Sequence, residues 1–324
     1  MEYTTLGDTG MTVSKICLGC MSFGDPDWRD WVLGEDEGTA LVERALDLGV
    51  NFFDTANMYS NGESERVLGK ALEGHRDETV VATKGYFQMD ESDPNSGGLS
   101  RKAIEQELQA SLDRLGMDTI DLYQIHRWDD DTPITETLAA LDDAVRRGQT
   151  RYVGASSMWA HQLGEALHAS DREGYDRFVT MQNHYNLVYR EEEREVLPLC
   201  EKEGVGVIPW SPLARGYLTR PDDEIDSTTR GETEEHLYRH PYRDGGGPEI
   251  NARVEELAAE KDVKMAQIAL AWQFHKEWVD APIVGTTSVE HLEDAVEALD
   301  IDLSGSDIEW LEEPYEPVRV SGHE

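Results

Sequence analysis

Eight short apolar runs, separated by longer amphipathic segments, follow one another from the beginning of this chain to its end. The runs are rich in β-branched residues and apolar almost throughout, which is typical of strands buried on both faces. We expect strands at 14–18, 51–54, 80–83, 122–125, 152–155, 179–182, 205–209 and 282–284. Eight strand–helix units in 324 residues favour an α/β fold, the closed (β/α)8 TIM barrel. An open doubly wound sheet is the alternative, weakened because no G-x-G-x-x-G turn follows a strand.

The segments between the runs repeat apolar residues at helical spacing. We expect helices at 38–48, 63–72, 101–115, 134–147, 158–169, 191–203, 250–274 and 289–299. Two segments lie outside this repeat. Residues 1–13 predict a β-hairpin that closes the bottom of the barrel, and residues 219–249 predict a long lid loop after the seventh strand. We expect a single domain that spans residues 1–324.

The charge of the chain excludes two classes of partner. It has 67 Asp and Glu against 29 Lys and Arg, a formal net charge of −38. Nucleic acids and anionic membrane surfaces would repel such a protein, so we expect neither as a partner. The acidic residues are spread along the chain rather than gathered in one tail, which favours adaptation to concentrated salt, where self-repulsion is screened. The alternative is an acidic mesophilic protein with ordinary solubility needs.

Cysteine usage and hydropathy favour a cytoplasmic protein. The three cysteines, Cys17, Cys20 and Cys200, are odd in number, and Cys17 and Cys20 lack the further ligands that a zinc site needs. We expect all three to be buried as small apolar residues. Because no apolar stretch reaches membrane-spanning length and residues 1–8 lack the pattern of a secretion signal, we expect neither a membrane anchor nor a signal peptide.

Ionisable side chains gather where three consecutive predicted strands end. Asp54 ends the second strand and Tyr59 follows it, Lys84 ends the third, and His126 comes directly after the fourth. The carboxyl ends of barrel strands meet at one mouth, so we expect these four side chains to converge there. A simple Asp54–Lys84 ion pair that closes the barrel is the structural alternative.

These residues belong to motifs by which the chain resembles the aldo-keto reductases. The motifs are Asp54-Thr-Ala-x-x-Tyr59, Thr83-Lys84, Gln124-Ile-His126, Gly154-Ala-Ser156-Ser157, Gln182-Asn183-x-Tyr185-Asn186 and Trp210-Ser211-Pro212-Leu213. The resemblance implies a catalytic tetrad of Tyr59, Asp54, Lys84 and His126 and a nicotinamide dinucleotide bound without a Rossmann fold. It also implies reduction of an aldehyde or ketone.

The chemistry of the four side chains agrees with that implication. Hydride addition to a carbonyl produces an alkoxide, which needs a proton donor, and the phenol of Tyr59 can be that donor. We expect the Lys84 ammonium to lower the pKa of this phenol and Asp54 to keep Lys84 charged and oriented. A neutral His126 can hold the substrate oxygen in line with Tyr59.

The resemblance also implies which residues hold the cofactor. Trp210 offers a flat face to the nicotinamide ring, and the segment from Ser211 and Leu213 to Tyr217 resembles the one that wraps the pyrophosphate. The other expected contacts are Ser156, Ser157, Gln182, Asn183, Gly285, Thr286, Thr287, His291 and Asp294. Since His291 stands where NADPH-selective members carry Arg, we expect a site that depends on hydroxyls, backbone amides and helix N-termini more than on cations. We favour NADP(H), with NAD(H) or the use of both as alternatives.

The substrate is expected to be a small carbonyl compound, apolar or sugar-like. The predicted walls of its site are Met21, Trp28, Trp31, Tyr86 and Trp128. Two other functions remain open: a cofactor-binding, redox-sensing regulatory subunit, and a Schiff-base lyase, against which Asp54 argues because Lys84 would have to be neutral. A metal hydrolase is disfavoured because the ten histidines include no His-x-His or His-Glu-x-x-His. His184 is expected to be structural, and the oligomeric state is left open.

Overall fold

Eight parallel strands curl into a barrel in the computed structural model, which describes residues 1–227 and 242–323. The strands are β3 (Cys17–Gly19), β4 (Phe52–Asp54), β5 (Val80–Gly85), β6 (Ile120–Ile125), β7 (Thr150–Ser156), β8 (Phe178–Gln182), β9 (Gly206–Val207) and β10 (Ile283–Gly285). Each pairs with the next in chain order, and β10 pairs with β3. A parallel bridge between Trp210 and Ile283 closes the ring. The predicted barrel is confirmed. Each strand overlaps a predicted one, although the first begins at Cys17 and not at residue 14.

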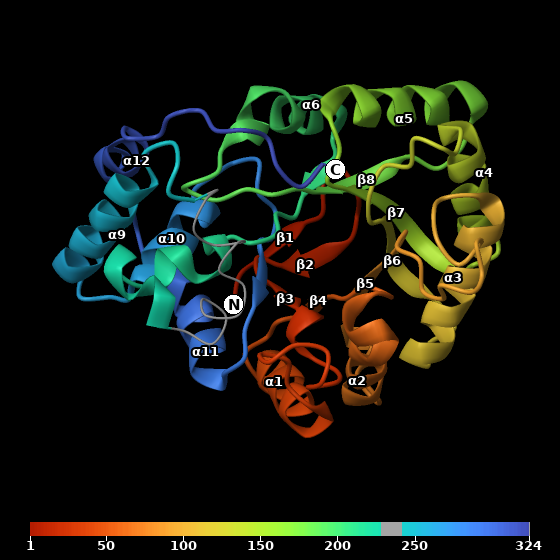
Figure 1. Cartoon of the computed structure of the whole chain (residues 1–324), viewed down its shortest axis with the longest axis horizontal. Coiled ribbons are helices and arrows are strands. Elements are labelled where there is room, and N and C mark those ends of the chain that lie inside the picture. The colour runs from red at the N-terminus through yellow and green to blue at the C-terminus, as the bar shows by residue number, and fades with distance from the viewer. Residues whose placement is uncertain (228–241, 324) are drawn as a thin grey trace.

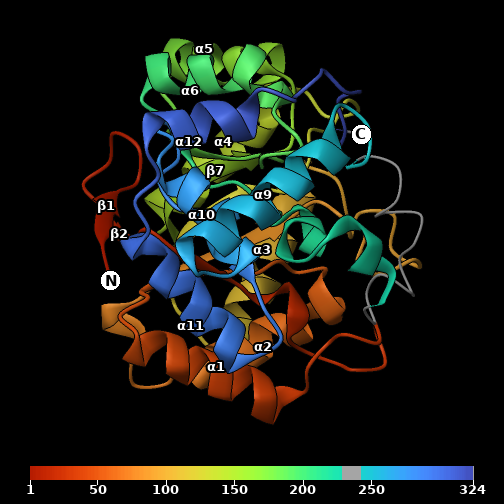
Figure 2. The same cartoon turned by 90° about the vertical axis from the view of Figure 1, so that its left-hand side faces the viewer.

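Helices cover the outside of the barrel (Figures 1 and 2). They are α1 (Glu35–Asp47), α2 (Glu63–Ala71), α3 (Arg101–Leu115), α4 (Ile134–Arg146), α5 (Ala160–Glu173), α6 (Val196–Glu203), α9 (Gly247–Lys261), α10 (Met265–Phe274), α11 (Val289–Glu297) and α12 (Gly305–Glu312). The largest apolar core fills the space between helices and strands, and a smaller one fills the barrel interior around Phe52, Leu122 and Ile283. Burial on both faces explains why the strands are apolar throughout.

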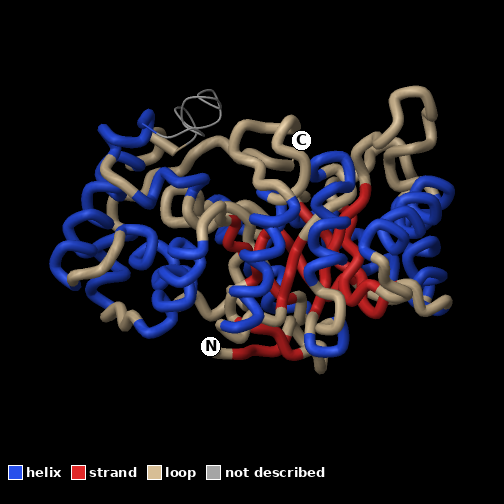
Figure 3. Tube along the Cα trace, turned by 90° about the horizontal axis from the view of Figure 1, so that it is seen from below, coloured by secondary structure: helices blue, strands red, loops and turns tan. Residues whose placement is uncertain are grey.

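The N-terminal hairpin closes the bottom of the barrel, as predicted (Figure 3). It consists of β1 (Tyr3–Thr5) and β2 (Thr12–Ser14), paired antiparallel. Leu6 and Val13 enter the inner apolar core. The amide of Gly7 donates to Asp280 at 2.8 Å, and the amide of Asp8 donates to the Gly204 carbonyl at 2.9 Å.

Two expectations about the C-terminal half need correction, and one helix there was not predicted. The single helix at 250–274 is two helices, because Asp262 adopts a left-handed conformation (φ 56°) that ends α9 before α10 begins. Helix α12, which Ser304 caps through the amide of Asp307, was not expected. The predicted lid is shorter than residues 219–249, because 222–227 form a 3-10 turn and α9 already begins at Gly247. Residues 228–241 of this lid lie outside the described residues.

The cysteines are all buried and free, as predicted. No helix in the described ranges is long and apolar enough to cross a membrane. Within those same ranges no three His, Cys, Asp or Glu side chains are grouped so that they could hold a metal ion.

Candidate active site

A cavity of about 1060 Å³ opens at the carboxyl ends of the strands. Its lining includes Gly19 from β3, Asp54 from β4, Ser156 from β7, Gln182 from β8 and Gly285 from β10. Tyr59 and His126 also face it, whereas Lys84 lies behind them and is fully buried. The structure therefore brings the four predicted catalytic residues together at the mouth of the barrel.

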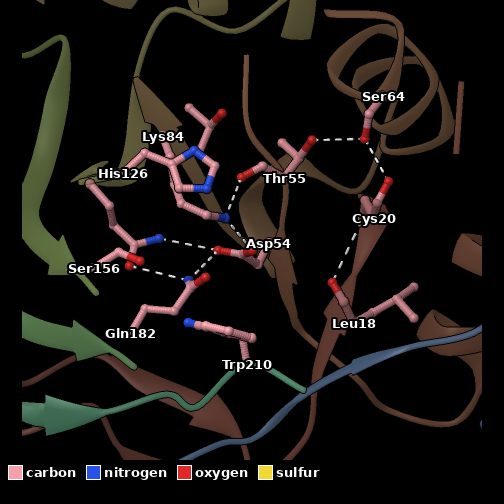
Figure 4. A network of polar contacts seen from close by, with 12 residues as sticks. Leu18, Cys20, Asp54, Thr55, Ser64, Lys84, His126, Ser156, Gln182 and Trp210 are labelled. Atoms are coloured by element: carbon pink, nitrogen blue, oxygen red, sulfur yellow. Dashed lines mark hydrogen bonds and ion pairs between the residues drawn. The ribbon is translucent and has the colours of Figure 1, made fainter. Parts of the chain in front are cut away.

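An ion pair between Lys84 and Asp54 forms the floor of this site (Figure 4). The Lys84 ammonium donates to Asp54 Oδ1 at 2.5 Å and to the Thr55 carbonyl at 2.7 Å. The other oxygen, Oδ2, accepts from the side-chain amides of Gln124 at 3.1 Å and Gln182 at 2.9 Å. Both charges are thus buried, but Lys84 donates two of these hydrogen bonds and Asp54 accepts three, which helps to compensate the loss of their hydration.

The Tyr59 ring lies between this pair and His126. The Lys84 ammonium is 5.1 Å from the Tyr59 ring centroid, and the rings of Tyr59 and His126 meet edge to face at 5.9 Å. His126 Nδ1 is buried and has no hydrogen-bond partner among the described residues. A phenol and an imidazole therefore face the cavity together.

Burial sets the protonation states of these groups. It raises the pKa of the Tyr59 phenol, and the Lys84 ammonium offsets this only in part, so the expected net lowering is not seen. Burial, helped by Lys84 and Arg127, holds the pKa of His126 well below its usual range. Burial alone would lower the pKa of Lys84, but Asp54 and Tyr59 raise it overall. At neutral pH the site holds a neutral phenol, a neutral imidazole and a charged ammonium.

Trp210 lines the cavity and is held rigidly from behind. Its indole N–H donates to Ser157 Oγ at 3.0 Å, and its ring stacks on His184 at 4.1 Å. His184 in turn stacks on Tyr189 at 4.0 Å, in agreement with its predicted structural role. Ser157 therefore orients Trp210 and does not itself line the cavity.

Two further residues expected at the nicotinamide lie differently from each other. Gln182 lines the cavity, but its side-chain amide nitrogen is engaged by Asp54. Asn183 is fully buried outside the lining, and both polar atoms of its side chain lack a partner in the described part of the chain. Such unpartnered polar atoms next to a cavity are what a bound polar ligand would satisfy.

The far end of the cavity contains more cations than the sequence suggested. Its expected members all line it: Ser211, Leu213, Gly285, Thr286, Thr287, His291 and Asp294. Arg215, Arg220 and Lys264 line it as well. Lys264 was not among the residues expected at the site, and its ammonium lies 2.7 Å from both Glu290 and Asp294.

The expected substrate walls are only partly those observed. Met21, Trp28 and Trp31 line the cavity, whereas Tyr86 and Trp128 do not. Their sequence neighbours Phe87 and Arg127 take those places. Trp128 packs against the main apolar core, and Tyr86 meets Phe87 edge to face at 5.3 Å.

The backbone around the cavity is strained. Seven non-glycine residues in the described ranges have a positive φ, and all but Asp262 lie close to predicted site residues in the sequence. Those six are Ser60, Asn61, Ser157, Ser211, Ala214 and Arg215. Because such conformations persist only where the surrounding structure enforces them, their clustering indicates a pre-formed site.

A model of the Aldo/keto reductase family matches residues 15–316. The chain belongs to this family. It is 43% identical to an aldo-keto reductase of Alternaria alternata, over 99% of this chain and 93% of the relative. It is 43% identical to a putative aryl-alcohol dehydrogenase of Schizosaccharomyces pombe (99% and 97% covered) and 42% identical to the versiconal hemiacetal acetate reductase of Aspergillus parasiticus (99% and 98%).

Membership identifies the protein as an oxidoreductase that acts on carbonyl and alcohol groups. The cavity described above agrees with that chemistry. It combines a buried phenol, a neutral imidazole and a charged ammonium at one end with Arg215, Arg220, Lys264 and hydroxyl groups at the other.

Proposed function

We propose that this aldo-keto reductase reduces an aldehyde or ketone to an alcohol with NAD(P)H, and that Tyr59 donates the proton. The observation that carries the proposal is the convergence of Tyr59, His126 and the Lys84–Asp54 pair on one cavity. We further propose that residues 1–324 form one domain that works in the cytoplasm on a small carbonyl substrate.

The cavity offers suitable contacts for a nicotinamide dinucleotide. Trp210 and Ser156 would hold the nicotinamide end, Arg215 and Arg220 the pyrophosphate, and Thr286, Thr287, His291 and Asp294 the adenosine end. When bound in its reduced form, the cofactor supplies the hydride that the carbonyl carbon receives. We favour NADP(H), because Lys264 adds a cation where the sequence suggested none.

Each side chain of the tetrad then has a distinct task. Tyr59 transfers its phenolic proton to the oxygen that receives the negative charge, and the Lys84 ammonium stabilises the phenolate left behind. Asp54 holds Lys84 in place and keeps it charged. The neutral imidazole of His126 orients the substrate oxygen toward Tyr59.

Substitution of Tyr59 by Phe tests this assignment. The variant keeps the ring packing and removes only the acidic proton. We expect kcat for a simple aldehyde to fall by about 10²–10⁴-fold. The dissociation constant for NADPH, measured by the quenching of Trp fluorescence, should remain within about twofold because the phenol is not among the proposed cofactor contacts. Turnover like that of the unsubstituted enzyme would refute the role of Tyr59. Rapid turnover by the unsubstituted enzyme would argue against the regulatory alternative.

We also propose that the acidic surface adapts the protein to concentrated salt. At a net charge of −38 the fold repels itself in dilute buffer. At about 1 M KCl the screening length falls to about 3 Å and the repulsion is suppressed. Activity and melting temperature should therefore both rise between dilute buffer and molar KCl. A loss of both over that range would contradict the adaptation.

A further inference from the structure

Ion pairs with carboxylates are the rule for arginine in this acidic protein. Acidic residues outnumber Lys and Arg by 67 to 29, and arginines such as Arg44, Arg114 and Arg177 each lie against Asp or Glu. Arg127, Arg215 and Arg220 differ, since none of them has a carboxylate partner in the described part of the chain. All three line the cavity. Where carboxylates are so plentiful, a guanidinium left unpaired inside a cavity indicates a site for an anionic ligand.

Two of these three arginines belong with the proposed cofactor. Arg215 lies in the segment from Ser211 to Tyr217 that is expected to wrap the pyrophosphate, and Arg220 follows that segment closely. The Arg215 guanidinium carbon lies 5.9 Å from the centroid of the Trp210 ring, next to the proposed nicotinamide position. A pyrophosphate would satisfy both arginines, so only Arg127 is left without an anion.

Arg127 lies on the substrate side of the site. It comes directly after His126, and one of its N–H groups donates to the His126 carbonyl at 2.7 Å. Its guanidinium carbon is 5.7 Å from the centroid of the Phe87 ring, which in turn lies 5.0 Å from the His126 ring. Its charge also acts on the Tyr59 phenol, whose pKa it lowers against the larger effects of burial. The guanidinium therefore borders the catalytic groups themselves.

The acid closest to Arg127 in the sequence is used elsewhere. Asp129 Oδ2 accepts hydrogen bonds from the Leu99 amide and from Thr132 Oγ1, both at 2.8 Å. Asp129 Oδ1 accepts from the Asp131 amide at 3.0 Å. This carboxylate organises its own loop, and the remaining N–H groups of Arg127 are left to the cavity.

We propose that Arg127 binds a carboxylate on the substrate, and that the enzyme prefers aromatic aldehydes that carry such a group over neutral aldehydes of the same shape. The inference rests on the proposed function, because it assigns a substrate class to the same site. A planar guanidinium can donate two parallel hydrogen bonds to one carboxylate. Trp28, Trp31 and Phe87 supply aromatic walls for the ring that carries it.

Two aldehydes that differ in one charge test the proposal. The substrates are 4-carboxybenzaldehyde and its methyl ester, and the enzymes are the unsubstituted protein, Arg127→Met, and Arg172→Met as a control. Arg172 pairs with Glu173 on the exposed side of α5, away from the cavity. The quantity compared is the ratio of kcat/KM for the acid to that for the ester, because a fraction of unfolded enzyme cancels in this ratio.

We expect the unsubstituted enzyme to favour the acid by about tenfold or more, and Arg127→Met to lower the ratio by about 10–100-fold. The control should keep the ratio of the unsubstituted enzyme. Equal efficiency for acid and ester in the unsubstituted enzyme, or a preference that survives in Arg127→Met, would overturn the proposal.

A binding measurement separates this inference from the proposed function. The product acid, 4-(hydroxymethyl)benzoate, is titrated into each enzyme with oxidised cofactor and followed by Trp fluorescence. Its dissociation constant should rise by about tenfold or more in Arg127→Met and stay unchanged in the control. If neither aldehyde is reduced, the proposed function fails and the titration alone decides whether Arg127 binds the anion. If both aldehydes are reduced but the dissociation constant is the same in Arg127→Met and the unsubstituted enzyme, only the proposal that Arg127 binds a carboxylate is refuted.

Discussion

Polar groups are arranged in opposite ways at the two ends of the barrel. At the bottom, Asp121 accepts from the Val81 amide and pairs with Arg76 and Arg151, all at 2.8 Å. At the top, His126 Nδ1 and both polar atoms of Asn183 have no partner in the described ranges. A buried polar group without a partner costs stability. Asp121 at the bottom is therefore satisfied by the chain alone, whereas we expect a bound ligand to satisfy the polar atoms of His126 and Asn183 at the top.

The Lys84–Asp54 pair is the exception at the top, because all of its hydrogen bonds are made within the protein. These bonds need no ligand. In this respect the pair resembles Asp121 at the bottom, but the Lys84 ammonium lies 5.1 Å from the centroid of the Tyr59 ring, which supports the proposed role of the pair in catalysis.

Removal of Lys84 should have the largest effect among these groups. In Lys84→Met the phenolate of Tyr59 loses its stabilising cation, so kcat should fall by about 10²–10⁴-fold. Arg76→Met is the matched control, since it also takes a cation from a buried carboxylate, but at the bottom. We expect it to lower the free energy of unfolding by about 1–3 kcal/mol without changing kcat per folded molecule. Similar losses of kcat in both variants would erase the distinction between the two ends.

Asp280 gives the bottom a measurable dependence on pH. Burial raises the pKa of this carboxyl from 3.8 to about 6, although the Gly7 amide opposes the rise. A raised native pKa means that the fold favours the protonated acid, and this contribution to stability is lost as pH rises through 6. Between pH 4 and pH 7 the stability of Asp280→Asn relative to the unsubstituted protein should therefore rise by about 2 kcal/mol.

Chemical denaturation in molar KCl at several pH values measures this difference. Asp27→Asn, at an exposed position, serves as the control for the loss of one negative charge. A constant offset between Asp280→Asn and the unsubstituted protein would show that Asp280 is not shielded from solvent at the hairpin.

Much of this arrangement could be predicted from the sequence. The eight strands are recognisable because they are buried on both faces, and the tetrad because neighbouring parallel strands must end at one mouth. Beyond the end of a strand the chain enters a loop, where the sequence pattern no longer determines which side chain faces the cavity. Tyr86 and Trp128 were expected there for this reason, but Phe87 and Arg127 occupy the lining.

Other features depend on contacts between distant segments. Asp262 ends a helix without a Gly or Pro to mark the break, because an aspartate can adopt the left-handed conformation. Lys264 meets Glu290 and Asp294 only because the N-terminus of α10 lies beside α11. No local pattern could have shown that a cation reaches the end of the cavity that we propose for the adenosine.

Lys264 combines features of both ends of the barrel. It lines the cavity at the top, but it is paired with two carboxylates, as the groups at the bottom are. Lys264→Met would leave Glu290 and Asp294 facing the cofactor without a cation. We expect kcat/KM for NADPH to fall by about tenfold, and that for NADH to change by less than about twofold because a ribose hydroxyl carries no charge.

Glu290→Gln should act in the opposite direction, because it removes one of the two competing carboxylates and frees the ammonium for a 2′-phosphate. Its kcat/KM for NADPH should rise by about two- to threefold, the size expected of an exposed charge pair. Dissociation constants for both cofactors, measured in dilute buffer and in molar KCl, separate binding from turnover. If the two variants shift the dissociation constant for NADPH in the same direction, Lys264 stabilises α11 and does not bind the 2′-phosphate. If they shift it in opposite directions, Lys264 contributes to the selection of NADPH although it is paired with carboxylates. Groups that bind the ligand would then include paired as well as unpaired side chains.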